Sequence, residues 1–144
     1  MKKWLCMFVC CLSVYVQAQV WTLKEKEPAA PGTWWCFRNT VTLEELPRSL
    51  ELRLAADTKY WLWVNGELQV SEGGLKRGPN PSDTYCDVIT SLPALRAGEN
   101  TLALLVWYFG KDGFSHRNSP TAGISFSLSC NGKEVEPDAK WRVK

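Results

Sequence analysis

The sequence has 144 residues, of which 17 are basic and 15 are acidic, and 45% of its residues are hydrophobic. This balance, without a basic stripe, argues against nucleic acid as a partner, because phosphate binding needs a basic surface. A chain of this length suits one domain with its own hydrophobic core.

The first eighteen residues have the pattern of a secretory signal peptide. Lys2 and Lys3 precede the apolar run 4–16, and a Val-Gln-Ala cleavage site ends at Ala18. We expect a mature chain that begins at Gln19, carries no net charge and is secreted or periplasmic. No later stretch is apolar for long enough to span a membrane.

Short strands follow the signal peptide. We expect an N-terminal strand and a linker over residues 19–34, with the strand at Val20–Leu23, and a β-sandwich domain over residues 35–144. Strand patterns occupy Thr33–Leu43 and Ser49–Ala55, and in the second of these leucines alternate with charged residues. One face of that strand is expected to be exposed to solvent.

The stretch Thr58–Val70 is the strongest structural signal. Its first half places Tyr60, Leu62 and Val64 on one face and tryptophans on the other, and Asn65-Gly66 then suits a type I′ turn. We expect a β-hairpin at the centre of a sheet, with a second layer over at least one face. Trp61, Trp63 and Trp107 are expected to pack in the core.

The remaining chain alternates between loops and strands. Expected loops and turns are Ser71–Thr84, a helical turn within Thr90–Ala97, Gly98–Asn100, Gly110–Gly123 and Asn131-Gly132. Expected strands are Tyr85–Ile89, Thr101–Phe109, Ile124–Cys130, Lys133–Val135 and Lys140–Val143. The last strand is expected to be cut short. Eight or nine short strands without an amphipathic helix predict an all-β, antiparallel β-sandwich of jelly-roll type.

Three cysteines remain after the signal peptide, namely Cys36, Cys86 and Cys130. Their wide spacing lacks the pairing of a metal-binding knuckle. We expect each to be a small buried hydrophobic residue on a strand, because free cysteine is often buried. Export would permit a disulfide, and its pairing stays open.

Three segments together resemble a known family. They are YWLWVNG at Tyr60–Gly66, YCDV at Tyr85–Val88, and LRAGENTLALLV at Leu95–Val106. They look like the N-terminal β-sandwich of bacterial α-L-rhamnosidases and related glycoside hydrolases, which resembles galactose-binding-like domains. The similarity runs from about Trp35 to Trp141.

The resemblance implies an accessory module without catalytic machinery. In the family this module precedes a helical barrel that supplies the catalytic carboxylates, and the sequence shows no such barrel. The expected partner is a carbohydrate of plant type or the catalytic domain of a glycosidase. A free-standing carbohydrate-binding or surface-adhesion protein, or an orphan structural fragment, remains an alternative.

The residues themselves offer weak catalytic candidates. Glycoside hydrolysis needs two carboxyl groups across one sugar, but Glu44 and Glu45 look like a solvated turn, and Asp87 is expected to fix a neighbouring turn. Asp112, Ser115 and His116 have the residue types of a triad without its supporting motif. The glycine spacing over 73–78 fails as a phosphate loop, because a proline stands in place of the lysine. No cofactor is expected, and calcium at Asp57, Asp83 or Asp112 stays open.

Sugar binding fits the two long loops better. Pyranose rings stack on aromatic side chains and accept hydrogen bonds from charged and amide groups. The candidate carbohydrate-binding residues are Arg77, Asp112, Phe114, His116 and Arg117. The alternative is that Phe114 plugs the end of the sandwich and the charged residues are only solvated.

Overall fold

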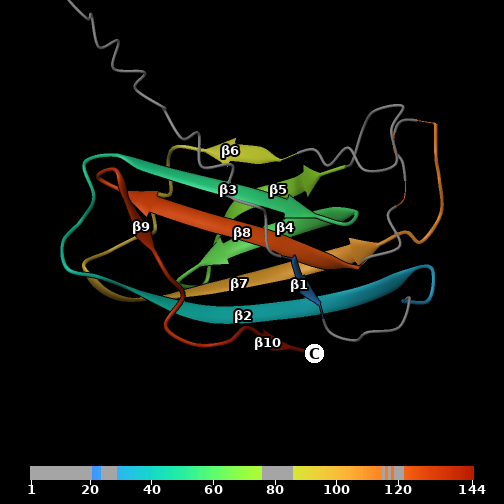
Figure 1. The fold of residues 1–144 in the computed structure, drawn as a ribbon, viewed down its shortest axis with the longest axis horizontal. Helices are drawn as coiled ribbons and strands as arrows, with labels where there is room; N and C mark the ends of the chain where they lie inside the picture. Colours follow the sequence, from blue (N-terminus) through green and yellow to red (C-terminus); the bar gives the residue numbers. More distant parts are fainter. Residues whose placement is uncertain (1–20, 24–28, 76–85, 115, 117, 119–121) are drawn as a thin grey trace, which may run out of the picture.

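The protein is a sandwich of two antiparallel sheets, seen in a computed structural model that describes residues 21–23, 29–75, 86–114, 116, 118 and 122–144 (Figure 1). The β8–β3 sheet has the order β1 (Trp21–Leu23), β8 (Gly123–Cys130), β3 (Leu50–Ala56) and β6 (Asp87–Ile89), with β9 (Lys133–Val135) also paired to β8. The β2–β7 sheet has the order β10 (Arg142–Val143), β2 (Thr33–Leu43), β7 (Gly98–Tyr108), β4 (Lys59–Val64) and β5 (Glu67–Gly74). The predicted all-β antiparallel sandwich is confirmed.

Alternation of side chains along the strands builds the core between the sheets. Every second residue of a strand points to the same face, and the inner residues of β2, β7 and β3 include Phe37, Leu104 and Leu52, all buried. The predicted alternation of Leu50, Leu52 and Leu54 is also confirmed, since Arg53 between them is exposed. Burial of each such side chain stabilises the fold by about 1.5–3 kcal/mol.

The hairpin of β4 and β5 forms as predicted, but it does not lie at the centre of a sheet. Asn65 and Gly66 have φ angles of 52° and 86°, as a type I′ turn requires. β5 is an edge strand, and β7 occupies the middle of the β2–β7 sheet with β2 and β4 on its two sides. β7 suits this place because it spans eleven residues and is apolar along both faces.

Parts of two predicted loop or turn segments belong to strands. β5 continues through Gly74, although Ser71–Thr84 was expected to be a loop, and residues 76–84 lie outside the described residues. Gly73 is needed there because a Cβ would lie 2.4 Å from the Tyr60 ring. Gly98–Asn100 begins β7 instead of forming a separate turn. Its glycine and two polar residues resembled turn residues, but Asn100 is buried and hydrogen-bonded.

Asn100 fastens the hairpin turn to the rest of the sandwich. The Asn100 side chain accepts a 2.9 Å hydrogen bond from Asn65 Nδ2 and donates a 2.7 Å bond to the Arg96 carbonyl. Asn65 Nδ2 also donates to the Ala94 carbonyl at 2.8 Å. Within the expected helical turn, the Leu95 amide donates to the Leu92 carbonyl at 3.0 Å. This is a single hydrogen-bonded turn.

None of the described residues forms a helix long and apolar enough to cross a membrane. The expected signal peptide, with its cleavage site between Ala18 and Gln19, lies outside the described residues.

Candidate functional site

The outer face of the β2–β7 sheet carries tryptophans that the sequence pattern had assigned to the core. Trp61, Trp63 and Trp107 are only partly buried, and they alternate with the buried Tyr60, Leu62 and Val106. The prediction of core packing for the three tryptophans is wrong. Both faces of β4 and β7 are apolar, so periodicity alone could not say which face meets the other sheet.

Five rings on this face and its adjoining loop form one continuous row, which we call the ring row: Trp61, Trp34, Trp107, Phe109 and His116. The Trp34 and Trp107 rings are stacked, with centroids 4.8 Å apart and planes 10° apart. Trp34 also lies 5.6 Å from Trp61 at 31°. Such contacts hold each ring in place, so few rotamers remain to be lost on binding.

The row continues into the loop after β7. The Phe109 ring meets Trp107 edge-on at 4.6 Å, and His116 meets Phe109 edge-on at 5.1 Å. Backbone pairing across the three strands β2, β7 and β4 therefore positions Trp34, Trp107 and Trp61, whereas the loop fold positions His116. Trp34 is 47% exposed and presents the largest apolar surface of the row.

Short hydrogen bonds fold this loop back on itself. His116 Nε2 lies 3.0 Å from the Lys111 carbonyl oxygen, and Asp112 Oδ1 accepts a 2.8 Å hydrogen bond from the Asn118 amide. Gly113 allows this fold, because a Cβ at its position would lie 2.4 Å from the His116 ring. The imidazole is thus fixed against Phe109, at the end of the ring row.

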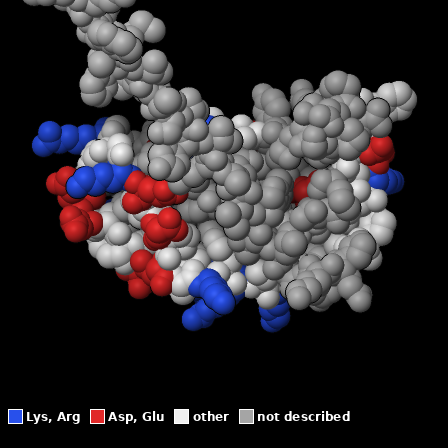
Figure 2. Space-filling view, viewed as in Figure 1, with Lys and Arg blue, Asp and Glu red and all other residues white. Residues whose placement is uncertain are grey.

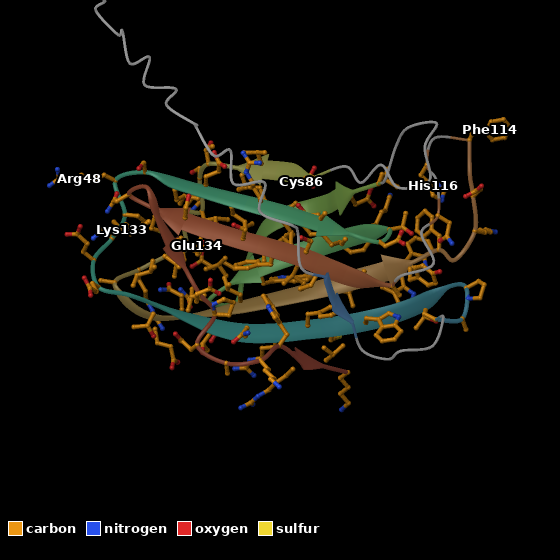
Figure 3. The ribbon with its side chains drawn as sticks, viewed as in Figure 1. Arg48, Cys86, Phe114, His116, Lys133 and Glu134 are labelled. Carbon is orange, nitrogen blue, oxygen red and sulfur yellow. The ribbon has the colours of Figure 1, made fainter. Side chains whose placement is uncertain are left out.

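The predicted sugar-binding residues separate into three groups. His116 joins the ring row, and Asp112 shapes the same loop. Phe114 is fully exposed and points away from the sandwich, so it does not plug the end of the core (Figure 3). Arg77 and Arg117 lie outside the described residues.

The weak catalytic candidates have structural partners. Asp87 Oδ2 accepts hydrogen bonds from the Tyr60 hydroxyl at 2.7 Å and from the Gly74 amide at 2.8 Å. The expectation that Asp87 fixes a neighbouring turn is confirmed for the end of β5. Burial first, and then this carboxylate, raise the pKa of Tyr60 far above its usual value.

The remaining candidates do not converge. Glu44 and Glu45 are exposed, as expected for a solvated turn. For the triad, His116 contacts the Lys111 carbonyl and Asp112 the Asn118 amide, while Ser115 lies outside the described residues. Of the calcium candidates, Asp83 also lies outside them. No group of three or more His, Cys, Asp or Glu that could hold a metal occurs in the described part of the chain.

The cysteine prediction holds at one position of three. Cys130 is buried, and burial raises the pKa of its thiol. Cys36 is exposed on the outer face of β2, and Cys86 is partly exposed just before β6. None of the three forms a disulfide with another described cysteine. Cys36 follows the alternation of β2, which places it on the same face as Trp34.

Two grooves lie on the surface formed by the described residues. One, of about 290 Å³, lies between the β2–β3 and β6–β7 connections and is lined in part by Arg48, Leu50, Leu92 and Leu95. Arg48 lies at the end of the sandwich opposite to Phe114 and His116 (Figure 3). The other, of about 250 Å³, lies along β2 and is lined in part by Arg38 and Arg142.

Solved structures with this fold include enzymes that act on L-rhamnosides. A glycoside hydrolase family 78 rhamnosidase from Bacillus sp. GL1 is 28% identical over 86% of this chain, with a TM-score of 0.74. The enzyme from Streptomyces avermitilis, solved with L-rhamnose, is 25% identical over 86% of the chain, with a TM-score of 0.57. The predicted resemblance is confirmed.

The match occupies only a small part of these enzymes, namely 13% of the Bacillus chain and 12% of the Streptomyces chain. That share is consistent with one N-terminal β-sandwich module. A lectin from Pleurotus ostreatus, solved with GalNAc, has the same fold at 17% identity and a TM-score of 0.54, and covers 85% of this chain and 34% of its own. No family model and no curated protein sequence matches this chain.

Proposed function

We propose that this chain is a secreted, non-catalytic accessory module of a rhamnosidase-like glycoside hydrolase, and that it binds carbohydrate through the ring row. The single observation that carries the proposal is the stacked, half-exposed Trp34 on the outer face of a module shaped like part of the Bacillus rhamnosidase. Sugar rings bind to aromatic surface beside a few placed polar atoms. His116, Asp112 and Asn118 supply such atoms at one end of the row.

Preorganisation supports this use of the row. A flexible surface tryptophan loses rotamer freedom when it binds a ligand, at a cost of about 0.5–1.5 kcal/mol. Trp34 is already held between Trp107 and Trp61, so that cost is largely met within the fold. His116 likewise loses little rotamer freedom on binding, because it is held by Phe109 and the Lys111 carbonyl.

A second candidate function is packing against a catalytic domain. The extent of the apolar surface favours it, because Leu68 is 49% exposed beside Trp63 on the same face, well away from His116. Large exposed apolar patches mark interaction surfaces. Both functions use the outer face of the β2–β7 sheet, and they differ in what covers it.

Calorimetric titration of the full chain with neutral, rhamnose-containing oligosaccharides tests the carbohydrate proposal. We expect Trp34→Ala to weaken binding several-fold, up to about tenfold, since stacking on an aromatic ring contributes about 0.5–1.5 kcal/mol. Val88→Ala is the matched control, because Val88 is 53% exposed on the outer face of the other sheet. Equal affinities for the two variants, or no binding by the unmodified chain, would refute carbohydrate binding by the ring row.

The non-catalytic and secreted parts of the proposal have their own readouts. Aryl rhamnosides should show no turnover above blank, and turnover abolished by one Asp or Glu substitution would contradict an accessory role.

Mass spectrometry of the exported protein should find an N-terminus at or near Gln19. Retention of Met1 would contradict cleavage.

A further inference from the structure

Two arginines face each other across adjacent strands at the lower edge of the β2–β7 sheet. Arg142 of β10 is the direct cross-strand partner of Arg38 of β2. Both are exposed, and Arg38 alternates with the buried Phe37 and Asn39, so the pair lies on the outer face. Directly opposed side chains have Cβ atoms about 4.5–5.5 Å apart, and like charges at that spacing repel each other.

No described carboxylate neutralises this pair. The ion pairs among the described residues join Arg53 to Glu51 and Lys59 to Glu72. Arg38 and Arg142 instead line the groove of about 250 Å³ along β2, together with Lys140 and a single acid, Glu99. Three cations against one carboxylate leave this groove with a formal charge of +2. Asp138, the acidic residue nearest to Lys140 in the sequence, accepts a hydrogen bond from the Thr42 hydroxyl instead.

The charge is local, since the mature chain is expected to be neutral as a whole. Figure 2 shows basic side chains along the lower edge of the view, over the part of the molecule where Figure 1 places β2 and β10 (Figure 2). Side chains of both signs mix at the left end of the same view. An uncompensated pair of like charges costs stability, and a bound anion would offset the repulsion.

We propose that this groove binds the carboxylates of an acidic, uronic-acid-containing glycan. The inference rests on the proposed carbohydrate function and names the class of glycan. Guanidinium groups bind planar carboxylates in a bidentate manner, and two opposed arginines offer two such forks. Trp34 lies on the outer face of β2 four residues from Arg38, a separation of about 13 Å along the strand. One chain of sugars thus stacks on the ring row and places its carboxylates in the groove.

Titration of the full chain with oligogalacturonides, compared with neutral dextran oligosaccharides of the same length, tests this inference. We expect the acidic ligand to bind at least about tenfold more tightly at low salt, and the difference to shrink as salt screens the charges. The double variant R38Q/R142Q should lose about tenfold or more of the affinity for oligogalacturonides. Glu99→Gln should raise that affinity about two- to threefold, because it removes the one carboxylate that lines the groove.

R48Q/K133Q is the matched control, since it also removes two positive charges (Figure 3). Arg48 and Lys133 lie at the end of the sandwich opposite to His116. It should bind oligogalacturonides like the unmodified chain. R38Q/R142Q should melt no lower than the unmodified chain, because it relieves a repulsive pair, so a loss of binding cannot be ascribed to unfolding.

Equal losses in the two double variants would overturn the inference, and so would equal affinity for acidic and neutral sugars. If poly-L-glutamate bound as tightly as oligogalacturonides, the groove would be a site for an acidic polypeptide, and the inference of an acidic glycan would be overturned. Binding of neutral rhamnose-containing sugars without any preference for oligogalacturonides would overturn the inference while leaving the proposed function intact.

Discussion

At the scale of single residues, Tyr60 ties three strands together. Its side chain is fully buried, its ring covers Gly73 of β5, and its hydroxyl donates a 2.7 Å hydrogen bond to Asp87 of β6. β6 belongs to one sheet and β4 and β5 to the other. This one hydroxyl therefore links the two layers at the edge where β5 ends.

Tyr60→Phe should destabilise the fold by about 1–3 kcal/mol, because the Asp87 carboxylate loses a donor in a partly buried site. Chemical denaturation followed by tryptophan fluorescence measures this change. Trp63→Phe, which keeps an aromatic ring on the outer face of the same strand and removes no buried hydrogen bond, is the control and should cost less. A Tyr60→Phe variant as stable as the unmodified chain would show that water replaces the hydroxyl without loss.

The same residue predicts a loss of stability in alkali. The pKa of Tyr60 is raised in the folded state, chiefly by burial. Below about pH 10 the phenol is neutral whether the chain is folded or unfolded, so the full stability is present. Above that pH the unfolded chain loses the proton while the folded chain keeps it, and stability falls. In Tyr60→Phe the fall above pH 10 should be shallower.

At the scale of elements, alternation in the sequence predicted most strands but could not assign faces where both were apolar. Thr33–Leu43 and Lys133–Val135 have the bounds expected for them, because each has clear turn residues at its ends. In β4 the sequence pattern does not distinguish the two faces. Tyr60 and Trp61 are equally plausible core residues by pattern, and only the position of the second sheet decides between them.

The candidate site was predictable in part for the same reason. His116 was identified from the composition of its loop, whereas Trp34 was missed as a surface residue because it sits next to the buried Trp35. The arginine pair required knowledge of pairing between segments a hundred residues apart. Local pattern contains no information on such register, which the packing of the whole chain determines.

β10 depends on the side chain just before it. Trp141 is partly buried and meets Phe126 of β8 edge-on, with ring centroids 5.2 Å apart. The pairing that follows is short, and it includes reciprocal hydrogen bonds between Cys36 and Lys144 at 2.8 and 3.0 Å. A two-residue strand cannot hold this edge alone, so Trp141 is its anchor.

Trp141→Ala should cost about 2–3 kcal/mol and release β10 from β2. Amide hydrogen exchange is the direct measurement, because the Cys36 and Lys144 amides should lose protection ahead of the β7 amides. Trp141→Phe keeps a ring against Phe126 and should retain most of the protection. Unchanged exchange in Trp141→Ala would mean that backbone pairing alone holds the edge.

At the scale of the whole molecule, the two outer faces differ in character. The outer face of the β8–β3 sheet carries Ser127, Ser129 and the 2.7 Å ion pair between Arg53 and Glu51. The outer face of the β2–β7 sheet carries the ring row with Trp63, Leu105 and Leu68. A polar outer face suits contact with water, whereas an apolar one of this extent suits a partner.

This asymmetry predicts how the isolated chain behaves in solution, and the outcome separates the two candidate functions. If the β2–β7 face serves to pack on another domain, the chain without that domain should associate reversibly through it as concentration rises, since two copies can bury the same apolar surface. Such association is expected of a face this apolar, because obligate protein interfaces are more hydrophobic than transient ones. Sedimentation velocity over a range from about 10 to 200 µM measures the association. The double variant W34S/L68S should then sediment as a monomer.

Val88→Ser provides the control for this last experiment, because Val88 is as exposed as Leu68 but lies on the outer face of the other sheet. It should associate like the unmodified chain. A monomer at every concentration, together with glycan binding that is lost in Trp34→Ala, would mean that the ring row is a carbohydrate surface that tolerates water in the free state. Association abolished by W34S/L68S, without glycan binding, would instead assign this face to a protein partner.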